Sequence, residues 1–246
     1  KPWLKVGTTA NYANYTSKAI SDGSGGTSYV SMIATVMTLA PYIADTYPAD
    51  ALPTQMQAQI ANGFTLLQNA NGDYYSCLGT MEQVHPMVAI RMNDKKNTGN
   101  SLMGTLYANF TPIKDLVFTT RLGYRIATDN TYTHNNLYYG SASASNKDRN
   151  GVTRTSLSTT YYQWENFVNY NTTLLDTHNI SAMLGMSYSQ SDQIYVSAGV
   201  DKIAKDNLLY ADVDWPAGDA VKSTGGHNYI YRKLSYFGRV GYDYKL

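Results

Sequence analysis

The sequence is short of charge. Only 15% of its 246 residues are Asp, Glu, Lys or Arg, whereas about 25% is usual for a soluble domain. The formal net charge is +1, and no run of Lys or Arg concentrates positive charge in one segment. A protein of this kind has no long-range field for a polyanion, so nucleic-acid binding is excluded.

Cysteine and long apolar runs are also scarce. Cys77 is the only cysteine, which excludes an intrachain disulfide, a cysteine zinc cluster and a redox pair. No run approaches the roughly 20 apolar residues of a spanning helix, so any membrane crossing would use strands of about 9–11 residues each. The chain starts at Lys1-Pro2-Trp3-Leu4 without the charged and apolar segments of an export signal. We therefore expect a processed protein or a fragment.

Tyrosine is abundant in place of charge. The 23 tyrosines bring the aromatic share to 13%. Tyrosine combines an apolar ring with a hydrogen-bonding tip, which suits a wall between hydrocarbon and water. A soluble, Tyr-rich adhesin would have a similar composition, so the strand pattern has to separate the two classes.

Six segments alternate apolar and polar residues with period two, the pattern of strands that present one set of side chains on each face. They cover residues 4–12, 102–110, 116–126, about 155–172, 180–189 and 233–245. We expect a curved antiparallel sheet with an apolar convex face that includes Phe118, Leu122, Leu184, Val240 and Tyr242. Its concave face is expected to carry Arg121, Arg125, Lys233 and Arg239.

The links between these segments alternate between long and short. Residues 111–115 and 173–178 form links of hairpin length, whereas 18–98, 127–154 and 194–228 are long. A transmembrane barrel has this asymmetry, with short periplasmic turns and long extracellular loops. We therefore expect both short turns at one end of the sheet. Within the first long link, the apolar stretch 29–43 predicts a short packing helix that is broken before Pro41.

No pattern in the sequence supports catalysis. The four histidines, His85, His134, His178 and His227, are scattered without metal-ligand spacing. Glu165 and Asp243 lie on separate predicted strands, and a solvated face explains both carboxylates more simply than an acid and base pair. We expect no catalytic residue, no bound metal, no cofactor and no enzymatic activity.

Two groups of residues are candidates for binding. The predicted concave face carries six charged side chains that would either wet the lumen of a barrel or contact a plug inside it: Arg121, Arg125, Glu165, Lys233, Arg239 and Asp243. The long links carry four aromatic residues that could contact a substrate, by stacking on sugar rings or by holding a peptide, or could contact the lid. They are Tyr138, Tyr139, Tyr210 and Trp215. The same aromatic residues could instead pack loops together or form an interfacial girdle.

Several stretches together resemble one family. KPWLKVG (1–7) and LSYFGRVGYDY (234–244) are similar to barrel strands of SusC/RagA-like, TonB-dependent outer-membrane transporters. WENFVNYN (164–171), HNI (178–180) and LGMSY (184–188) resemble a strand, turn and strand of that family, and residues 109–118 are similar as well. These stretches are spread along nearly the whole chain.

The resemblance implies an all-β fold: an antiparallel, up-and-down transmembrane β-barrel segment of about six strands, with long extracellular loops and short periplasmic turns. Barrels of this family have about 22 strands, so residues 1–246 would form only part of a TonB-dependent receptor barrel domain, without the family's plug and signal peptide.

The same resemblance implies import of oligosaccharides or peptides across the outer membrane. The expected partners are TonB, a SusD-like lipoprotein lid and outer-membrane lipid. The alternative is a Tyr-rich soluble or surface-attached β-sheet protein used for binding or adhesion. A bare apolar face favours the barrel, whereas a second covering layer favours the alternative.

Overall fold

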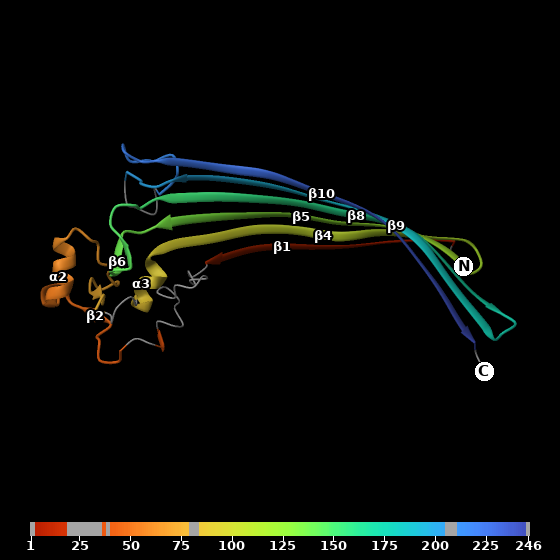
Figure 1. Cartoon of the computed structure of the whole chain (residues 1–246), viewed down its shortest axis with the longest axis horizontal. Coiled ribbons are helices and arrows are strands. Elements are labelled where there is room, and N and C mark those ends of the chain that lie inside the picture. Colours follow the sequence, from red (N-terminus) through yellow and green to blue (C-terminus); the bar gives the residue numbers. More distant parts are fainter. Residues whose placement is uncertain (1–2, 19–35, 38–39, 79–83, 205–210, 245–246) are drawn as a thin grey trace.

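A computed structural model of the chain describes residues 3–18, 36–37, 40–78, 84–204 and 211–244. One antiparallel sheet of six strands dominates them (Figure 1). Across the sheet, the strands are β1 (Leu4–Lys18), β4 (Asn93–Ile113), β5 (Leu116–Asn135), β8 (Val152–Leu174), β9 (His178–Val200) and β10 (Lys222–Tyr244). The order in space follows the order in the chain, so the predicted fold class is confirmed.

The two short turns lie together at one end of the sheet, as predicted (Figure 1). Lys114 and Asp115 join β4 to β5, and residues 175–177 join β8 to β9. Asp115, Leu175 and Asp176 have φ values of 69°, 52° and 61°. Such left-handed conformations let the chain reverse within two or three residues.

The strands are much longer than the sequence predicted. β8, β9 and β10 have 23 residues each, which corresponds to roughly 75 Å of extended chain. The prediction that residues 18–98, 127–154 and 194–228 are loops was therefore wrong at their margins, because 93–98, 127–135, 152–154, 194–200 and 222–228 belong to strands. Side chains in 93–98, 127–135 and 222–228 are mostly polar on both faces, so the backbone remains paired there while the apolar alternation disappears.

A small lobe of short elements lies beside the loop end of the sheet. It contains β2 (Thr46–Tyr47), η2 (Ala49–Ala51), α2 (Thr54–Ala61), β3 (Tyr74–Tyr75), α3 (Pro86–Arg91), β6 (Tyr138–Ser141) and β7 (Ala144–Asn146). Helix α3 begins where His85 Nδ1 accepts the Met87 N–H at 3.2 Å and Pro86 occupies the first turn. None of the described helices has the length and hydropathy needed to span a bilayer. Most of the predicted 29–43 helix lies outside the described residues.

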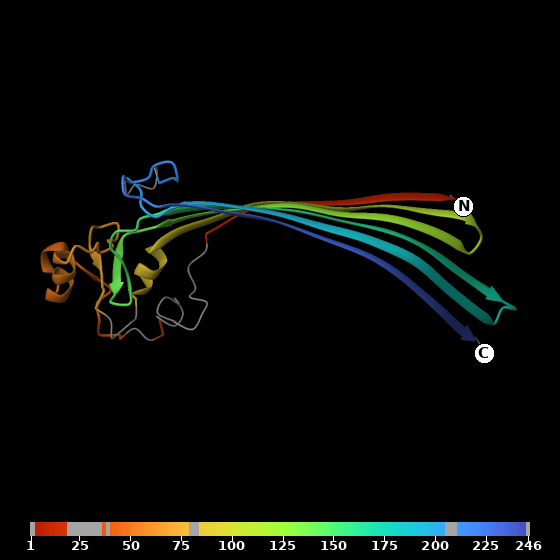
Figure 2. The same ribbon diagram turned by 45° about the horizontal axis from the view of Figure 1, so that its top comes forward.

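Two small cores hold the loop end. In the lobe, Val84, Val88 and Ala89 are buried with Tyr75 and Ala144. The second core joins the ends of β8 and β9 to the segment after β9, through Val152, Val200, Ile203 and Ala211. Figure 2 shows the lobe on one side of the sheet and the β9–β10 connection on the other.

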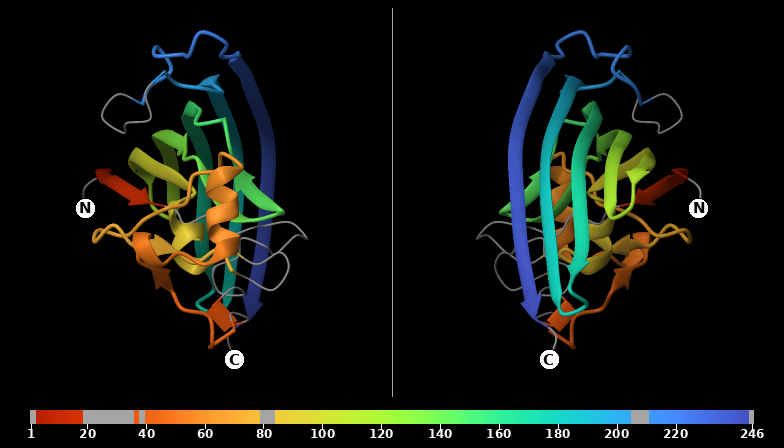
Figure 3. Two further views of the ribbon diagram at one scale, coloured as in Figure 1. Left: turned by 90° about the vertical axis from the view of Figure 1, so that its left-hand side faces the viewer. Right: turned by 90° about the vertical axis from the view of Figure 1, so that its right-hand side faces the viewer.

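The strand register separates the side chains into two faces. No register shift occurs among β5, β8, β9 and β10, and the one irregularity in β4 falls between Phe110 and Ile113. Odd-numbered residues of the six long strands therefore share one face, called the polar face below, and even-numbered residues share the other, called the apolar face. Viewed along its length, the sheet is curved (Figure 3).

Candidate functional site

The apolar face carries a continuous band of exposed hydrophobic side chains near the turn end of the sheet. Leu184, Tyr236 and Val240 are 72%, 75% and 81% exposed. Every long strand contributes to this band: Leu4, Val6, Tyr12, Leu102, Leu106, Phe110, Phe118, Leu122, Ile126, Trp164, Tyr170, Leu184, Leu234, Tyr236, Val240, Tyr242 and Tyr244. Among the described residues no second layer covers the band, since the sheet there is a single ribbon layer (Figure 2). Phe118, Leu122, Leu184, Val240 and Tyr242 share this face, as expected.

The loop-side edge of the band is a row of tyrosines that end in a hydrogen-bond network. The Tyr162 and Tyr188 hydroxyls donate to Gln190 Oε1 at 3.0 and 2.9 Å, and Arg232 Nε donates to the same oxygen at 3.0 Å. Gln190 Nε2 in turn donates to Asp192 at 2.8 Å. The rings thus lie on the band while their hydroxyls lie in a polar layer, the arrangement of aromatic residues at a membrane interface.

The polar face is hollowed across five strands. Arg121, Arg125 and Glu165 line a hollow of about 820 Å³ together with small polar side chains, including Thr9, Asn11, Thr105, Ser191 and Gln193. A hollow that spans so many strands of a single sheet lies on its concave side. The sheet therefore brings together three of the six charged residues that were predicted to lie on this face.

Within this hollow, Arg121 is held by two contacts. Its guanidinium lies 3.7 Å from Glu165 and 5.8 Å from the centre of the Phe167 ring. Gln163 Nε2 donates to Glu165 at 2.8 Å, which orients the carboxylate. The Arg121 side chain is 50% exposed, so the ion pair contributes about 1 kcal/mol or less to stability and leaves the guanidinium available to a ligand.

The other three charged candidates lie on β10, away from that hollow. Lys233 pairs with Ser189, Arg239 with Met183 and Asp243 with Asn179. Asp243 lines a smaller hollow of about 370 Å³ near the two turns, with Lys114 and Asp115. All three occupy the polar face, but they form no cluster with Arg121 and Glu165.

Aromatic rings on the polar face lie over glycines, a feature that sequence reasoning missed. Tyr107 pairs with Gly7 and Tyr15 with Gly99, and each ring occupies the space that a Cβ would fill on the glycine. The same holds for Phe237, which pairs with Gly185. These rings lie against the wall instead of projecting from it, which widens the concave side. A correct strand register would have revealed these pairs, because it sets each glycine opposite an aromatic residue.

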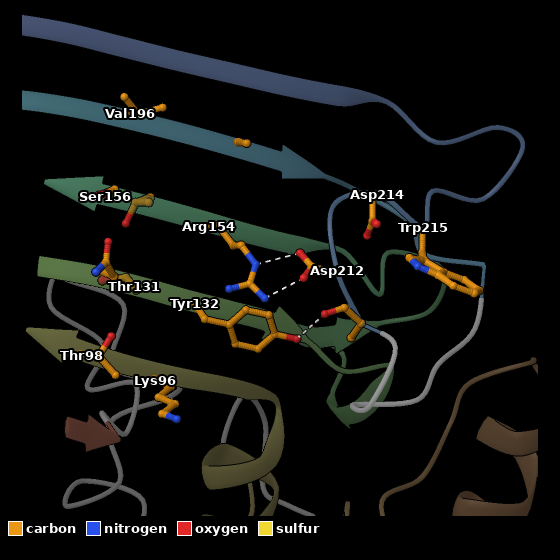
Figure 4. Close-up of a pocket in the computed structure, with 14 residues that line it drawn as sticks. Lys96, Thr98, Thr131, Tyr132, Arg154, Ser156, Val196, Asp212, Asp214 and Trp215 are labelled. Atoms are coloured by element: carbon orange, nitrogen blue, oxygen red, sulfur yellow. Dashed lines mark hydrogen bonds and ion pairs between the residues drawn. The ribbon is translucent and has the colours of Figure 1, made fainter.

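The loop aromatic residues have different surroundings. Tyr138 packs against the lobe core, where burial raises the pKa of its hydroxyl, and the Tyr139 ring lies 4.9 Å from Phe64. Both therefore pack loop segments together. Trp215 lines a hollow on the apolar face beyond the band (Figure 4). Tyr210 lies outside the described residues.

The histidines have structural contacts. His85 caps α3, His178 Nδ1 lies 2.8 Å from the Tyr242 hydroxyl, and the His227 ring stacks on Tyr195 at 5.0 Å. His134 is buried 3.8 Å from Asp94. Within the described part of the chain, no group of three His, Cys, Asp or Glu side chains could hold a metal ion.

An ion pair near Trp215 was not foreseen, because both partners lay in segments predicted as loops or strand margins. Arg154 Nε and Nη2 donate to the two carboxylate oxygens of Asp212, both at 2.7 Å (Figure 4). These bonds hold the pKa of Asp212 below its ordinary value of 3.8. The Arg154 guanidinium also lies 4.9 Å from the centre of the Tyr132 ring.

Comparison with known proteins gives a likeness in structure. The chain is similar to a chain in the structure of the RagAB peptide transporter, with a TM-score of 0.64 and 17% identity over 99% of this chain. The likeness establishes the fold. The RagAB peptide importer in its 'open-open' and 'closed-closed' states gives TM-scores of 0.65 and 0.62, each over 100% of this chain at 17% identity.

The chain spans about a quarter of the length of those solved chains, since it covers 24–25% of them. No family model matches the sequence, and no curated protein matches it either. The matched structures are those of a peptide transporter, and the fold of this chain agrees with the fold that the sequence resemblance implied.

Proposed function

We propose that this chain is part of the outer-membrane barrel of a TonB-dependent, SusC/RagA-like importer of oligosaccharides or peptides. The observation that carries the proposal is a single curved sheet with a bare apolar band on one face and a hollowed polar face on the other. The fold likeness to the RagAB transporter over the whole chain supports it.

The band has the height that a bilayer requires. On β9 it runs from Ile180 to Tyr188, and nine residues of strand extend about 30 Å, or roughly 23 Å along the membrane normal at a tilt near 40°. The apolar band of outer-membrane barrels is about 25 Å tall. Lipid would cover Leu184 and Val240, and Tyr188 would mark the outer interface.

The polar face would then line the lumen. Its serines, threonines and asparagines keep the lumen hydrated, while Arg121, Arg125 and Glu165 offer charge to a plug or to a passing cargo. Lys233, Arg239 and Asp243 would have the same role on the neighbouring stretch of wall. A SusD-like lipoprotein would sit over the loop end, and TonB would act on the plug of the whole transporter.

The rival function is binding or adhesion by a soluble, Tyr-rich β-protein. Such a protein would have to bury Leu184, Tyr236 and Val240 beneath a second layer. The described residues place loop structure only over the far end of the apolar face, next to Val152 and Val200. The exposure of the band therefore favours transport.

Thiol labelling of the intact protein in native outer membranes tests the proposal. In a Cys77→Ser background, Leu184→Cys and Ser187→Cys place one thiol on each face of β9. A membrane-impermeant maleimide should label the Ser187→Cys thiol and should reach the Leu184→Cys thiol only after denaturation. Deletion of the gene should also abolish growth on the imported oligosaccharide or peptide. Equal labelling of both thiols in native membranes, or recovery of the protein in the soluble fraction, would refute the barrel.

A further inference from the structure

A second hollow, of about 760 Å³, lies on the apolar face at the loop end of the sheet (Figure 4). Its floor is built from even-numbered residues of neighbouring strands, among them Lys96, Tyr132 and Arg154. One wall is the segment after β9, with Asp212, Asp214 and Trp215. Because these strand residues share a face with the band, the hollow does not open onto the polar face.

The position of the hollow along the strand is defined by β8. Arg154 precedes Tyr162, at the edge of the band, by eight residues, which is about 26 Å of strand. If the chain is a barrel wall, as proposed above, the hollow lies outside the barrel and above the lipid. Cargo in the lumen would have no access to it.

The walls of the hollow are fixed by contacts within the chain. Asp212 is held by both hydrogen bonds from Arg154, and its Oδ1 also accepts the Val213 N–H at 2.8 Å. The Tyr132 hydroxyl donates to the Ala211 carbonyl at 2.9 Å. A site whose polar groups are already oriented binds with a smaller loss of conformational entropy.

The lining is charge-balanced and rich in planar polar groups. Lys96 and Arg154 bring two positive charges, and Asp212 and Asp214 bring two negative charges. Hydroxyl and amide side chains such as Thr98, Asn130 and Ser156 make up much of the remainder, together with the apolar Val196, Ala198 and Ala211. Trp215 is 44% exposed at the rim, so part of its indole is accessible.

We propose that this hollow binds a neutral saccharide. An indole can pack against the C–H face of a sugar ring, and carboxylate, guanidinium and amide groups can pair with adjacent hydroxyls. Balanced charge gives no preference for phosphate or for an acidic ligand, which would require a net positive lining. The saccharide would come either from a sugar chain of the outer-leaflet glycolipid or from free oligosaccharide outside the cell.

Calorimetric titration of the intact, detergent-solubilised protein tests this inference with two probes. One is maltohexaose, a free neutral oligosaccharide, and the other is the delipidated, dephosphorylated oligosaccharide released from the host outer membrane. We expect at least one probe to bind, and the one that binds more tightly identifies the source. Trp215→Ala should weaken binding by about tenfold, Trp215→Phe should retain most of it, and Trp164→Phe, a control in the band, should leave it unchanged.

An uptake assay separates this inference from the proposed function. Trp215→Ala should lose saccharide binding and keep cargo uptake, because the hollow is remote from the lumen. Absence of binding by both probes, or equal binding by the wild type and Trp215→Ala, would overturn the inference. Cross-linking of another protein to this face in native membranes, with the hollow covered, would also overturn it. Failure of the thiol-labelling test with saccharide binding intact would instead refute only the membrane barrel.

Discussion

Replacing Leu184 by arginine is the most direct test of the apolar band. Leu184 lies at the centre of the band on β9, four residues from Tyr188 at one edge and four from Ile180 near the other. Its side chain is 72% exposed, so the change would remove little packing within the chain. In the proposed barrel, however, it would place a guanidinium near the bilayer midplane, which costs about 2–4 kcal/mol.

Ser187→Arg is the matched control on the same strand. Ser187 lies on the polar face, and its strand neighbours are Glu165 on β8 and Ser235 on β10. An arginine there would be hydrated and close to a carboxylate, so the expected change in folding free energy is within about 0.5 kcal/mol. The two substitutions add the same side chain three residues apart and differ in the face.

Folding of the intact protein into lipid vesicles, followed by urea titration, would measure both changes. Heat-modifiable migration on a gel reports the folded fraction at each urea concentration. Leu184→Arg should lower the transition midpoint, whereas Ser187→Arg should leave it near that of the wild type. Similar midpoints for the two variants, or a larger loss for Ser187→Arg, would show that the band does not face lipid.

Two further predictions concern groups outside the band. Burial raises the pKa of the Cys77 thiol from 9.0 to about 11. At pH 8, iodoacetamide should therefore alkylate this thiol about 100-fold more slowly than in the unfolded chain, and the rate should rise until about pH 11. Equal rates in the folded and unfolded chain would contradict the burial of Cys77. The Arg154–Asp212 pair should stabilise the β9–β10 connection fully above the ordinary carboxyl pKa of 3.8 and lose that effect as the pH falls through the lowered value. Both side chains are 38% exposed or more, so Asp212→Asn should cost about 0.2–1 kcal/mol at neutral pH. The loss should appear as faster proteolysis of the β9–β10 connection in the variant than in the wild type. Equal proteolysis rates would show that the ion pair does not stabilise this connection.

The sequence predicted the sheet where its two faces differ in polarity. Alternation placed Phe118 and Leu122 opposite Arg121 and Arg125 correctly, and the two hairpin-length links predicted both turns. Alternation failed to predict the strands beyond the band, because the first part of β8, for example, carries Thr153, Ser156 and similar polar residues on both faces. Backbone pairing does not depend on which side chains are polar, so no periodic pattern marks those extensions.

The candidate residues divide in the same way. Strand alternation predicted that Arg121, Arg125 and Glu165 share a face, whereas their proximity follows from the register of β5 with β8, in which Arg121 pairs with Glu165. The roles of Tyr138 and Tyr139 could not be separated from that of Trp215, since packing in a loop depends on long-range contacts such as the one with Phe64. The contact of Arg154 with Asp212 spans 58 residues, and no local pattern predicts it.

The position of the apolar band on successive strands provides a final argument about the barrel. Thr8, at the centre of the band on β1, is linked by strand pairing through Leu106, Leu122, Trp164 and Tyr188 to Leu234 on β10. The band on β10 runs from Leu234 to Tyr244, so its centre lies between Gly238 and Val240, about five residues farther along the strand. Five residues correspond to about 17 Å along the strand, and five strand spacings to about 24 Å across the sheet, so the band crosses the strands at the slope of a tilt near 35°. Closed membrane barrels have tilts of about 35–45°. The sequence determines where the band lies on each strand, and the fold determines which residues pair across the strands. A band that follows a flat bilayer must therefore shift along successive tilted strands at this angle.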